Sequence, residues 1–115
     1  MRLVVIESPY AGKTDEETRE NVDYAKHCVH DCLKRGEAPY ASHLFFTQPG
    51  ILDDKVQGER ILGINAGFAW AEKADVVVVY MDRGMSKGME DGIRRARDSG
   101  QNLEYRSLVS PLVGH

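Results

Sequence analysis

The chain has 115 residues, of which 42% are hydrophobic and 29% charged, and its formal net charge is -3. This length predicts one domain with a modest core, over residues 1–115. Acidic and basic residues are interspersed, so no basic patch supports general nucleic-acid binding. No apolar run approaches the roughly 18 residues of a membrane span, and the N-terminal segment lacks the apolar region of a signal peptide. We therefore expect no membrane partner and a cytoplasmic protein.

Short runs rich in β-branched residues predict strands at residues 2–6, 38–42, 75–80 and 103–108. Helical periodicity lies between them, over residues 15–35, 54–73 and 86–99. Alternating strands and helices indicate parallel strands joined by right-handed crossovers. The sequence therefore predicts a small three-layer, Rossmann-like α/β domain with four to five mainly parallel strands. The tail, residues 110–115, is expected to be irregular, and residues 43–54 form a long connection without periodicity.

The first helix is expected to follow a capping box of Thr14 and Glu17. Its predicted buried stripe consists of Val22, Ala25, Val29, Cys32 and Leu33. The residues of the second helix predicted to point inward are Ile61, Ile64, Phe68 and Ala71, with Trp70 in the core or at an interface.

Cys28 and Cys32 are four residues apart in the first helix and belong to its apolar side. A disulfide between them would distort the helix, so we expect buried free thiols, which are typical of a reducing compartment. His27 and His30 lie nearby, and a metal site is the alternative interpretation. The sequence otherwise indicates neither a metal nor a cofactor.

The most informative segment, residues 76–96, joins four consecutive valines to a glycine-rich loop and a helix. A continuous apolar run is typical of a strand buried on both faces. Ser86 is a candidate N-cap, and Gly88 would let a ligand approach the backbone. A helix N-terminus at the carboxyl end of a parallel strand favours an anion. The segment predicts a phosphate or sugar site, with an ordinary capped helix as the alternative.

Three segments resemble nucleoside 2-deoxyribosyltransferase-like proteins: Ser8-Pro9-Tyr10 after the first strand, residues 74–80, and the helix from Ser86 to Ala96. Residues 48–54 and 104–108 also resemble short members of that superfamily, many of them from phages. The superfamily includes deoxyribosyl transferases and nucleoside 5′-monophosphate N-glycosidases. The resemblance implies the same fold and a nucleotide or nucleotide-derived ligand. It also implies a homo-oligomer, because such relatives commonly build the site at a subunit interface.

One position departs from the pattern of the glycosidases, Ser-x-Gly-x-x-x-Glu-x-x-x-Ala. Ser86, Gly88 and Ala96 match this pattern, whereas Gly92 stands where the resemblance places the nucleophilic glutamate. Gly92 serves close packing of the helix on the sheet or leaves room for a ligand. The missing carboxylate predicts that glycosidic cleavage is slow or absent. It leaves enzymatic activity uncertain and favours a binding protein.

If the chain is active, Asp82, Glu90 and Asp91 are the candidate replacement carboxylates. A helix turns about 100° per residue, so Glu90 and Asp91 point away from the direction of residue 92. Acids in a first helical turn also complement the helix dipole, which is their alternative role. Asp82, in the loop before the helix, is the better candidate for a carboxylate that holds a ribose hydroxyl. An ordinary loop aspartate is the alternative.

Four further residues are candidates for the ligand site. Ser8 and Tyr10 follow the first strand, and Tyr10 would stack on a base or cover the core. Arg19 lies early in the first helix, and His43 follows the second strand. A surface arginine and a histidine that closes a helix end are the alternatives.

The leading hypothesis is a nucleotide-binding protein on a deoxyribosyltransferase-like fold, of a phage type that sequesters a nucleotide or nucleotide-derived immune signal in the host cytoplasm. The alternative is a nucleoside 5′-monophosphate N-glycosidase or deoxyribosyl transferase that uses another carboxylate. A third hypothesis is a partner-binding protein without a small ligand, whose crevice is filled by side chains.

Overall fold

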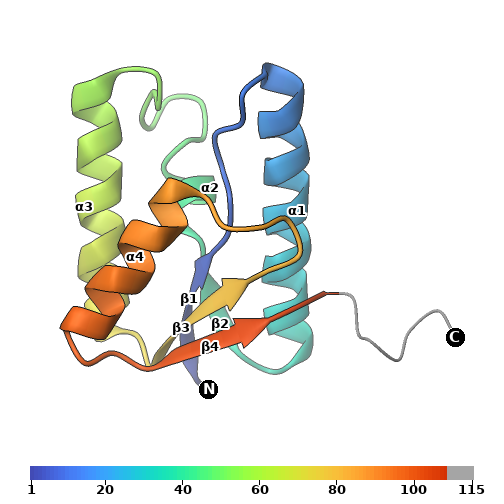
Figure 1. The fold of residues 1–115 in the computed structure, drawn as a ribbon, viewed down its shortest axis with the longest axis vertical. Coiled ribbons are helices and arrows are strands. Elements are labelled where there is room, and N and C mark those ends of the chain that lie inside the picture. The colour runs from blue at the N-terminus through green and yellow to red at the C-terminus, as the bar shows by residue number, and fades with distance from the viewer. Residues whose placement is uncertain (109–115) are drawn as a thin grey trace, which may run out of the picture.

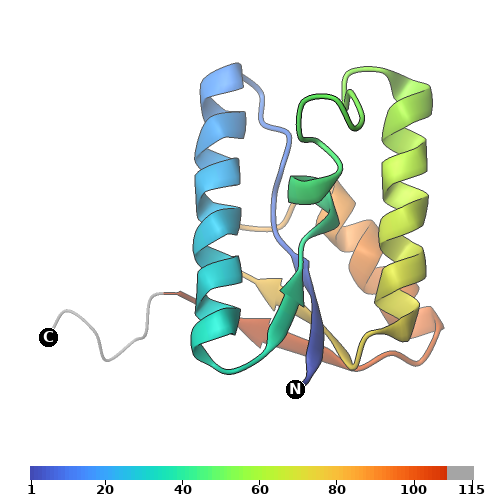
Figure 2. The same cartoon turned by 180° about the vertical axis from the view of Figure 1, so that it is seen from behind.

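The computed structural model describes residues 1–108. Its four strands form one parallel sheet in the order β2-β1-β3-β4: β1 (Leu3–Glu7), β2 (Ala38–Tyr40), β3 (Val76–Tyr80) and β4 (Leu103–Arg106). The helices that connect them are α1 (Asp15–Lys34), α2 (Ser42–Phe45), α3 (Gln57–Lys73) and α4 (Lys87–Asp98). The predicted α/β class and parallel sheet are confirmed (Figures 1 and 2). The irregular tail expected at residues 110–115 lies outside the described residues.

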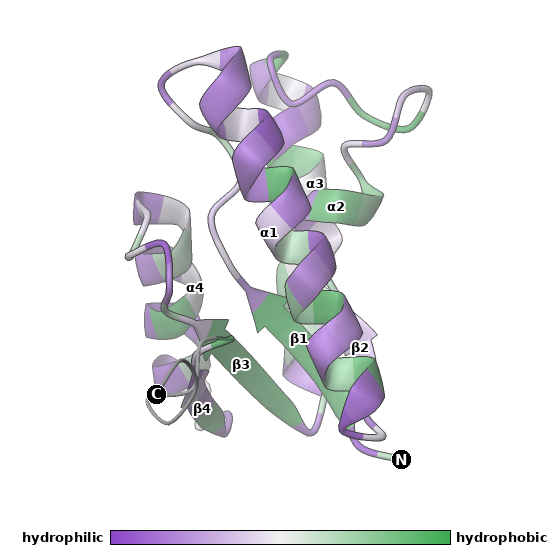
Figure 3. Ribbon diagram, turned by 90° about the vertical axis from the view of Figure 1, so that its right-hand side faces the viewer, coloured by the Kyte–Doolittle hydropathy of each residue, from purple (hydrophilic) through white to green (hydrophobic). Residues whose placement is uncertain are grey.

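The sheet lies between α1 on one face and the pair α3 and α4 on the other, which gives the three predicted layers (Figures 1 and 2). Side chains alternate along each strand. Ile6 of β1 faces α1 and packs with Cys28 and Cys32, whereas Val5 faces α4 and packs with Ala96. Every residue of β3 is buried, as expected for a strand covered on both faces. Figure 3 shows β1 and β3 as hydrophobic ribbons between helices of mixed hydropathy.

Helix α1 begins where the sequence predicts. The Oγ1 of Thr14 accepts a hydrogen bond from the backbone N–H of Glu17 at 3.0 Å. Cys28 and Cys32 are buried free thiols, as predicted, and burial raises the pKa of Cys28 to about 12. The prediction that Leu33 is buried is wrong: it is 56% exposed, because it lies one residue past the side of α1 that carries Cys28 and Cys32. No helix within residues 1–108 is long and apolar enough to cross a membrane.

The long connection contains the short helix α2, which the sequence analysis did not predict. Helix α2 packs closely on α3 because Gly67 has no side chain: a Cβ atom there would lie 2.6 Å from the Oγ of Ser42. The prediction that Ile61 and Ile64 turn inward is wrong, since they are 48% and 41% exposed. The reason is the length of α3, whose first half extends beyond the carboxyl edge of the sheet (Figure 1).

A cluster of charges closes the α1 face of the sheet beside β4. The guanidinium group of Arg106 donates to both carboxylate oxygens of Glu37, at 2.7 and 2.6 Å, and Arg2 donates to Glu37 at 2.6 Å. The side chains of Arg106 and Glu37 are only 8% and 9% exposed, whereas Glu104, which accepts from both arginines, is 40% exposed. Hydrogen bonds from Arg106 and Arg2 lower the pKa of Glu37 to about 2.

Candidate functional site

The carboxyl ends of β1 and β3 lie side by side at the centre of the sheet. The loop after β1 leads to α1 on one face, and the loop after β3 leads to α4 on the other (Figure 1). Ligands of open α/β sheets bind in the crevice at such a topological switch point. This edge of the sheet is therefore the candidate site.

The first turn of α4 lies at this edge and is open to a ligand. The Oγ of Ser86 accepts a hydrogen bond from the backbone N–H of Met89 at 3.2 Å, so Ser86 is the N-cap of the helix. Among the described residues, a Cβ atom at Gly88 would meet only the Oγ of Ser86 within 4 Å, at 3.9 Å. N–H groups of a first turn lack acceptors inside the helix and carry the positive end of its dipole. Such N–H groups can donate hydrogen bonds to an anion.

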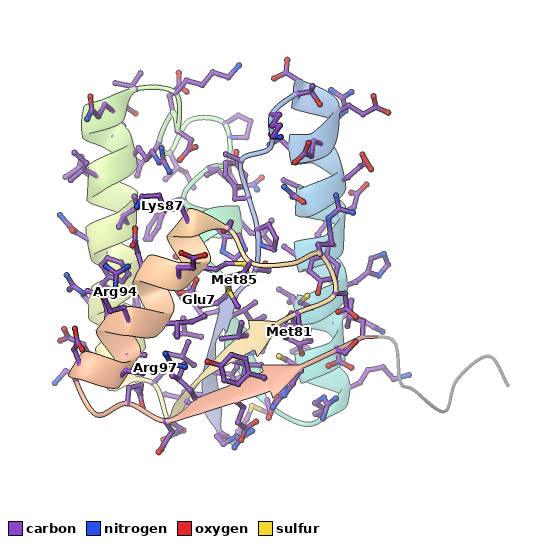
Figure 4. All side chains as sticks on the ribbon, viewed as in Figure 1. Glu7, Met81, Met85, Lys87, Arg94 and Arg97 are labelled. Carbon is purple, nitrogen blue, oxygen red and sulfur yellow. The ribbon has the colours of Figure 1, made fainter. Side chains whose placement is uncertain are left out.

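Glu7, the last residue of β1, extends toward α4 and fills the space beside Gly92 (Figure 4). A Cβ atom at Gly92 would lie 2.7 Å from the Cδ of Glu7 and 3.0 Å from its Oε1, so the absence of a side chain at this position leaves room for the carboxyl group. Burial raises the pKa of Glu7 to about 8. Within residues 1–108, no hydrogen bond or ion pair holds this carboxyl group, so it is mostly protonated at neutral pH.

Ser8 and His43 meet next to Glu7 at the end of β1. The Oγ of Ser8 lies 2.7 Å from the Nε2 of His43, which is a hydrogen bond. Burial lowers the pKa of His43 to about 4, so its ring is neutral at pH 7. His43 and Tyr10 line two adjoining hollows that share Leu52. The structure therefore gathers Ser8, Tyr10 and His43 on the β1 side of the candidate site.

Asp82 is turned toward α1 rather than α4. Its carboxylate accepts hydrogen bonds from the hydroxyl of Tyr24 at 2.6 Å, from the hydroxyl of Ser107, and from the backbone N–H of Leu108 at 2.9 Å. These bonds tie the β3 loop to α1 and to the segment after β4. They give Asp82 an anchoring role at the edge of the sheet.

The other three charged candidates lie on helix surfaces. Arg19 of α1 and Glu90 of α4 are exposed, and Asp91 forms a 3.2 Å ion pair with Arg94. A narrow slot between α3 and α4 holds Glu7, and none of these three residues lines it. Within the described part of the chain, no group of three or more His, Cys, Asp or Glu side chains could hold a metal ion.

Glu7 is the residue of this edge that the sequence analysis missed, because the first strand is predicted to end at Ile6. The alternation of the strand is the signal that points to it. Val5 and Glu7 are two residues apart and face the same side, so a carboxyl group continues a buried apolar face. Charged residues are rarely buried without a partner, and a perturbed carboxyl group in a crevice is a candidate for function.

The comparison with solved structures shows the type of fold. A 2-deoxyribosyltransferase from the psychrotolerant bacterium Bacillus psychrosaccharolyticus, described as a biocatalyst for nucleoside synthesis, superimposes with a TM-score of 0.63. The match covers 97% of this chain and 77% of that chain, at 13% sequence identity. The chain therefore has a deoxyribosyltransferase-like fold.

A match of the sequence to a known family identifies the family of this chain. Residues 2–106 match the family described as a domain of unknown function, DUF7768, and the chain belongs to this family. No curated protein matches the sequence.

Proposed function

We propose that the protein binds a nucleotide at the carboxyl edge of β1 and β3, with the phosphate at the first turn of α4 and the sugar directed toward Glu7. One juxtaposition carries this proposal: the first-turn N–H groups of Lys87 and Gly88 suit an anion, and the neutral carboxyl group of Glu7 in β1 lies beside Gly92, farther along the helix. The deoxyribosyltransferase-like fold supports a nucleoside-type ligand.

The spacing along α4 supports the same ligand. Gly92 follows Ser86 by six residues, which is about 9 Å along a helix axis. The phosphate and the glycosidic bond of a nucleotide are likewise separated by several ångströms. A protonated carboxyl group at that point can donate a hydrogen bond to the sugar or the base. On this proposal the protein removes a nucleotide or nucleotide-derived signal from solution, the role inferred from its resemblance to phage proteins.

Replacing Ser86 by alanine is expected to weaken nucleotide binding about tenfold or more, since a hydrogen bond to a charged group contributes about 1.5–3 kcal/mol. Calorimetry with nucleoside mono- and triphosphates and the matching nucleosides measures the effect. Thr14→Ala is the matched control, because it removes the equivalent cap of α1 and leaves α4 intact. Equal affinities for nucleosides and nucleotides would contradict the phosphate assignment.

We also propose that the protein acts as a homo-oligomer, most simply a two-fold dimer that buries α3. The exposed apolar side chains of this helix are Ile61, Leu62, Ile64 and Trp70, which are 41–62% exposed. The ring of Trp70 lies 5.4 Å from that of Tyr40, whose buried hydroxyl group has no hydrogen-bond partner among residues 1–108. These side chains point in different directions around α3, and exposed apolar side chains gathered on one element are typical of an interface.

Sedimentation velocity at tens of micromolar is expected to give a dimer or larger species for the native chain. Leu62→Lys should shift it toward the monomer, because the substitution places a charge in the proposed interface. Leu33→Lys on α1 is the matched control, since Leu33 is exposed to a similar degree, 56% against 62%. A native chain that sediments as a monomer would refute the oligomer.

A further inference from the structure

We propose that Glu7 is a catalytic acid, which donates a proton to the leaving base and so promotes cleavage of the N-glycosidic bond of the bound nucleotide. The inference rests on the proposed function, because it needs the sugar to lie between the first turn of α4 and Glu7. It assigns the acting carboxyl group to β1, whereas the candidates taken from the sequence lie in the β3 loop and on α4.

Two features that lower the stability of the fold, a glycine inside a helix and a buried carboxyl group, lie next to each other. A glycine inside a helix costs about 1 kcal/mol relative to alanine, and Gly92 lies in the middle of α4. A buried carboxyl group without a partner also costs stability, and Glu7 is such a group among the described residues. The first feature makes room for the second, since a side chain at position 92 would displace the Glu7 carboxyl group. Sequences depart from favourable local choices chiefly at functional sites.

The surroundings of Glu7 keep its carboxyl group neutral. The slot around it is lined by Phe68 and Ala71 of α3 and by Gly92 and Ala96 of α4. The charged groups that face this slot are Glu72 of α3 and Arg95 of α4, and the guanidinium of Arg95 lies 4.2 Å from the ring centre of Phe68. Neither forms a hydrogen bond or an ion pair with Glu7. Glu7 itself is partly exposed at this slot.

The neutral carboxyl group suits the chemistry of a leaving base. The proton of Glu7 moves to a ring nitrogen of the base while the C1′–N bond breaks, and the bonding electron pair goes to the base. A water molecule then adds its oxygen to the positively charged C1′ and returns a proton to the Glu7 carboxylate. The products are the free base and the sugar 5′-phosphate, and Glu7 is again protonated. A general acid works best when its pKa lies near the working pH, as it does for Glu7 at about 8.

The expected pH dependence of base release follows from the raised pKa of Glu7. The rate is expected to be level below pH 8 and to fall about tenfold per pH unit above it, because the group must be protonated to act. Burial lowers the pKa of His43 to about 4, well below this range. A fall centred near pH 8 therefore reports on Glu7.

The test is chromatography of free base released by the full chain from purine and pyrimidine nucleoside and deoxynucleoside monophosphates. Glu7→Gln retains the shape of the neutral carboxyl group but has no acidic proton. It is expected to lower base release about 10²- to 10⁴-fold, the usual contribution of a general acid, while nucleotide affinity changes little. Glu7→Asp is expected to restore part of the rate.

A second variant tests the position of the carboxyl group without removing it. Gly92→Ala forces the flexible end of Glu7 aside and is expected to slow base release by at least tenfold. Gly58→Ala is the matched control, since among the described residues nothing lies within 4 Å of a Cβ atom at that helical glycine.

The outcomes separate the two proposals. Nucleotide binding by the native chain without base release would overturn the catalytic role of Glu7 and leave the binding function standing. Base release that is unchanged in Glu7→Gln, or that rises through pH 8, would overturn the role of Glu7 as proton donor. Failure to bind any nucleotide would overturn the proposed function and this inference with it.

Discussion

Replacing Glu37 by glutamine is expected to lower the free energy of unfolding by about 3–5 kcal/mol, the usual result of breaking a buried ion pair. The substitution leaves the guanidinium of Arg106, which is 8% exposed, without its main partner. Urea unfolding followed by circular dichroism measures the change. Glu104→Gln is the matched control, because Glu104 contacts the same two arginines but is 40% exposed. A surface partner of this kind contributes about 0–1 kcal/mol.

The same substitution is expected to change how stability depends on pH. The pKa of Glu37 is about 2 in the folded chain and 4.5 as its ordinary value. A carboxylate with a lowered pKa stabilises the fold above its ordinary pKa and loses this contribution as the pH falls through the folded value. The native chain should therefore lose about 3 kcal/mol between these two pH values through Glu37, at roughly 1.4 kcal/mol per pKa unit. Equal acid sensitivity of Glu37→Gln would contradict this account.

Replacing Gly92 by glutamate is expected to destabilise the chain by about 3 kcal/mol, at the upper end of the range for overpacking. The new Cβ atom would overlap the Glu7 carboxyl group, and a second acid would share a slot that already keeps one carboxyl group neutral. The same change should weaken binding of an anionic ligand, because it fills the site and adds negative charge.

A double-mutant cycle isolates the contact between these two residues. Glu7→Ala combined with Gly92→Glu removes the overlap, so the double variant should regain most of the lost stability. The coupling between residues in direct contact is typically about 0.5–3 kcal/mol. Gly58→Glu is the control, since the space around this exposed glycine is open among the described residues. Additive effects at positions 7 and 92 would mean that the two residues do not touch.

Most of the fold could be predicted because its signals are local. Thr14 and Ser86 mark helix starts by their capping side chains, and the valine run of β3 has the continuous apolar character of a doubly covered strand. Alternation of strands and helices then leaves few topologies. Helix α3 was harder to predict, since its apolar residues do not distinguish contact with the sheet from exposure beyond its edge, as Ile61 and Ile64 illustrate.

The candidate site could be predicted only where one segment contains it. Ser86 and Gly88 are neighbours in the sequence, so their place at the start of a helix follows from the local pattern. The contact between Glu7 and Gly92 joins residues far apart in the chain, and it depends on the register between β1 and α4. Asp82 illustrates the same limit, because its partners come from α1 and from the segment after β4.

The outer edge of β2 affects how copies of this chain can associate. Ala38 donates its N–H toward β1, at 2.9 Å from the carbonyl oxygen of Arg2, so the next residue, Pro39, faces the open edge. Proline has no N–H to offer, and the strand is only three residues long. Such an edge is a poor template for another strand, which protects the sheet from open-ended, fibre-like growth. Copies of the chain are therefore expected to associate through their helices, in contacts that form closed oligomers.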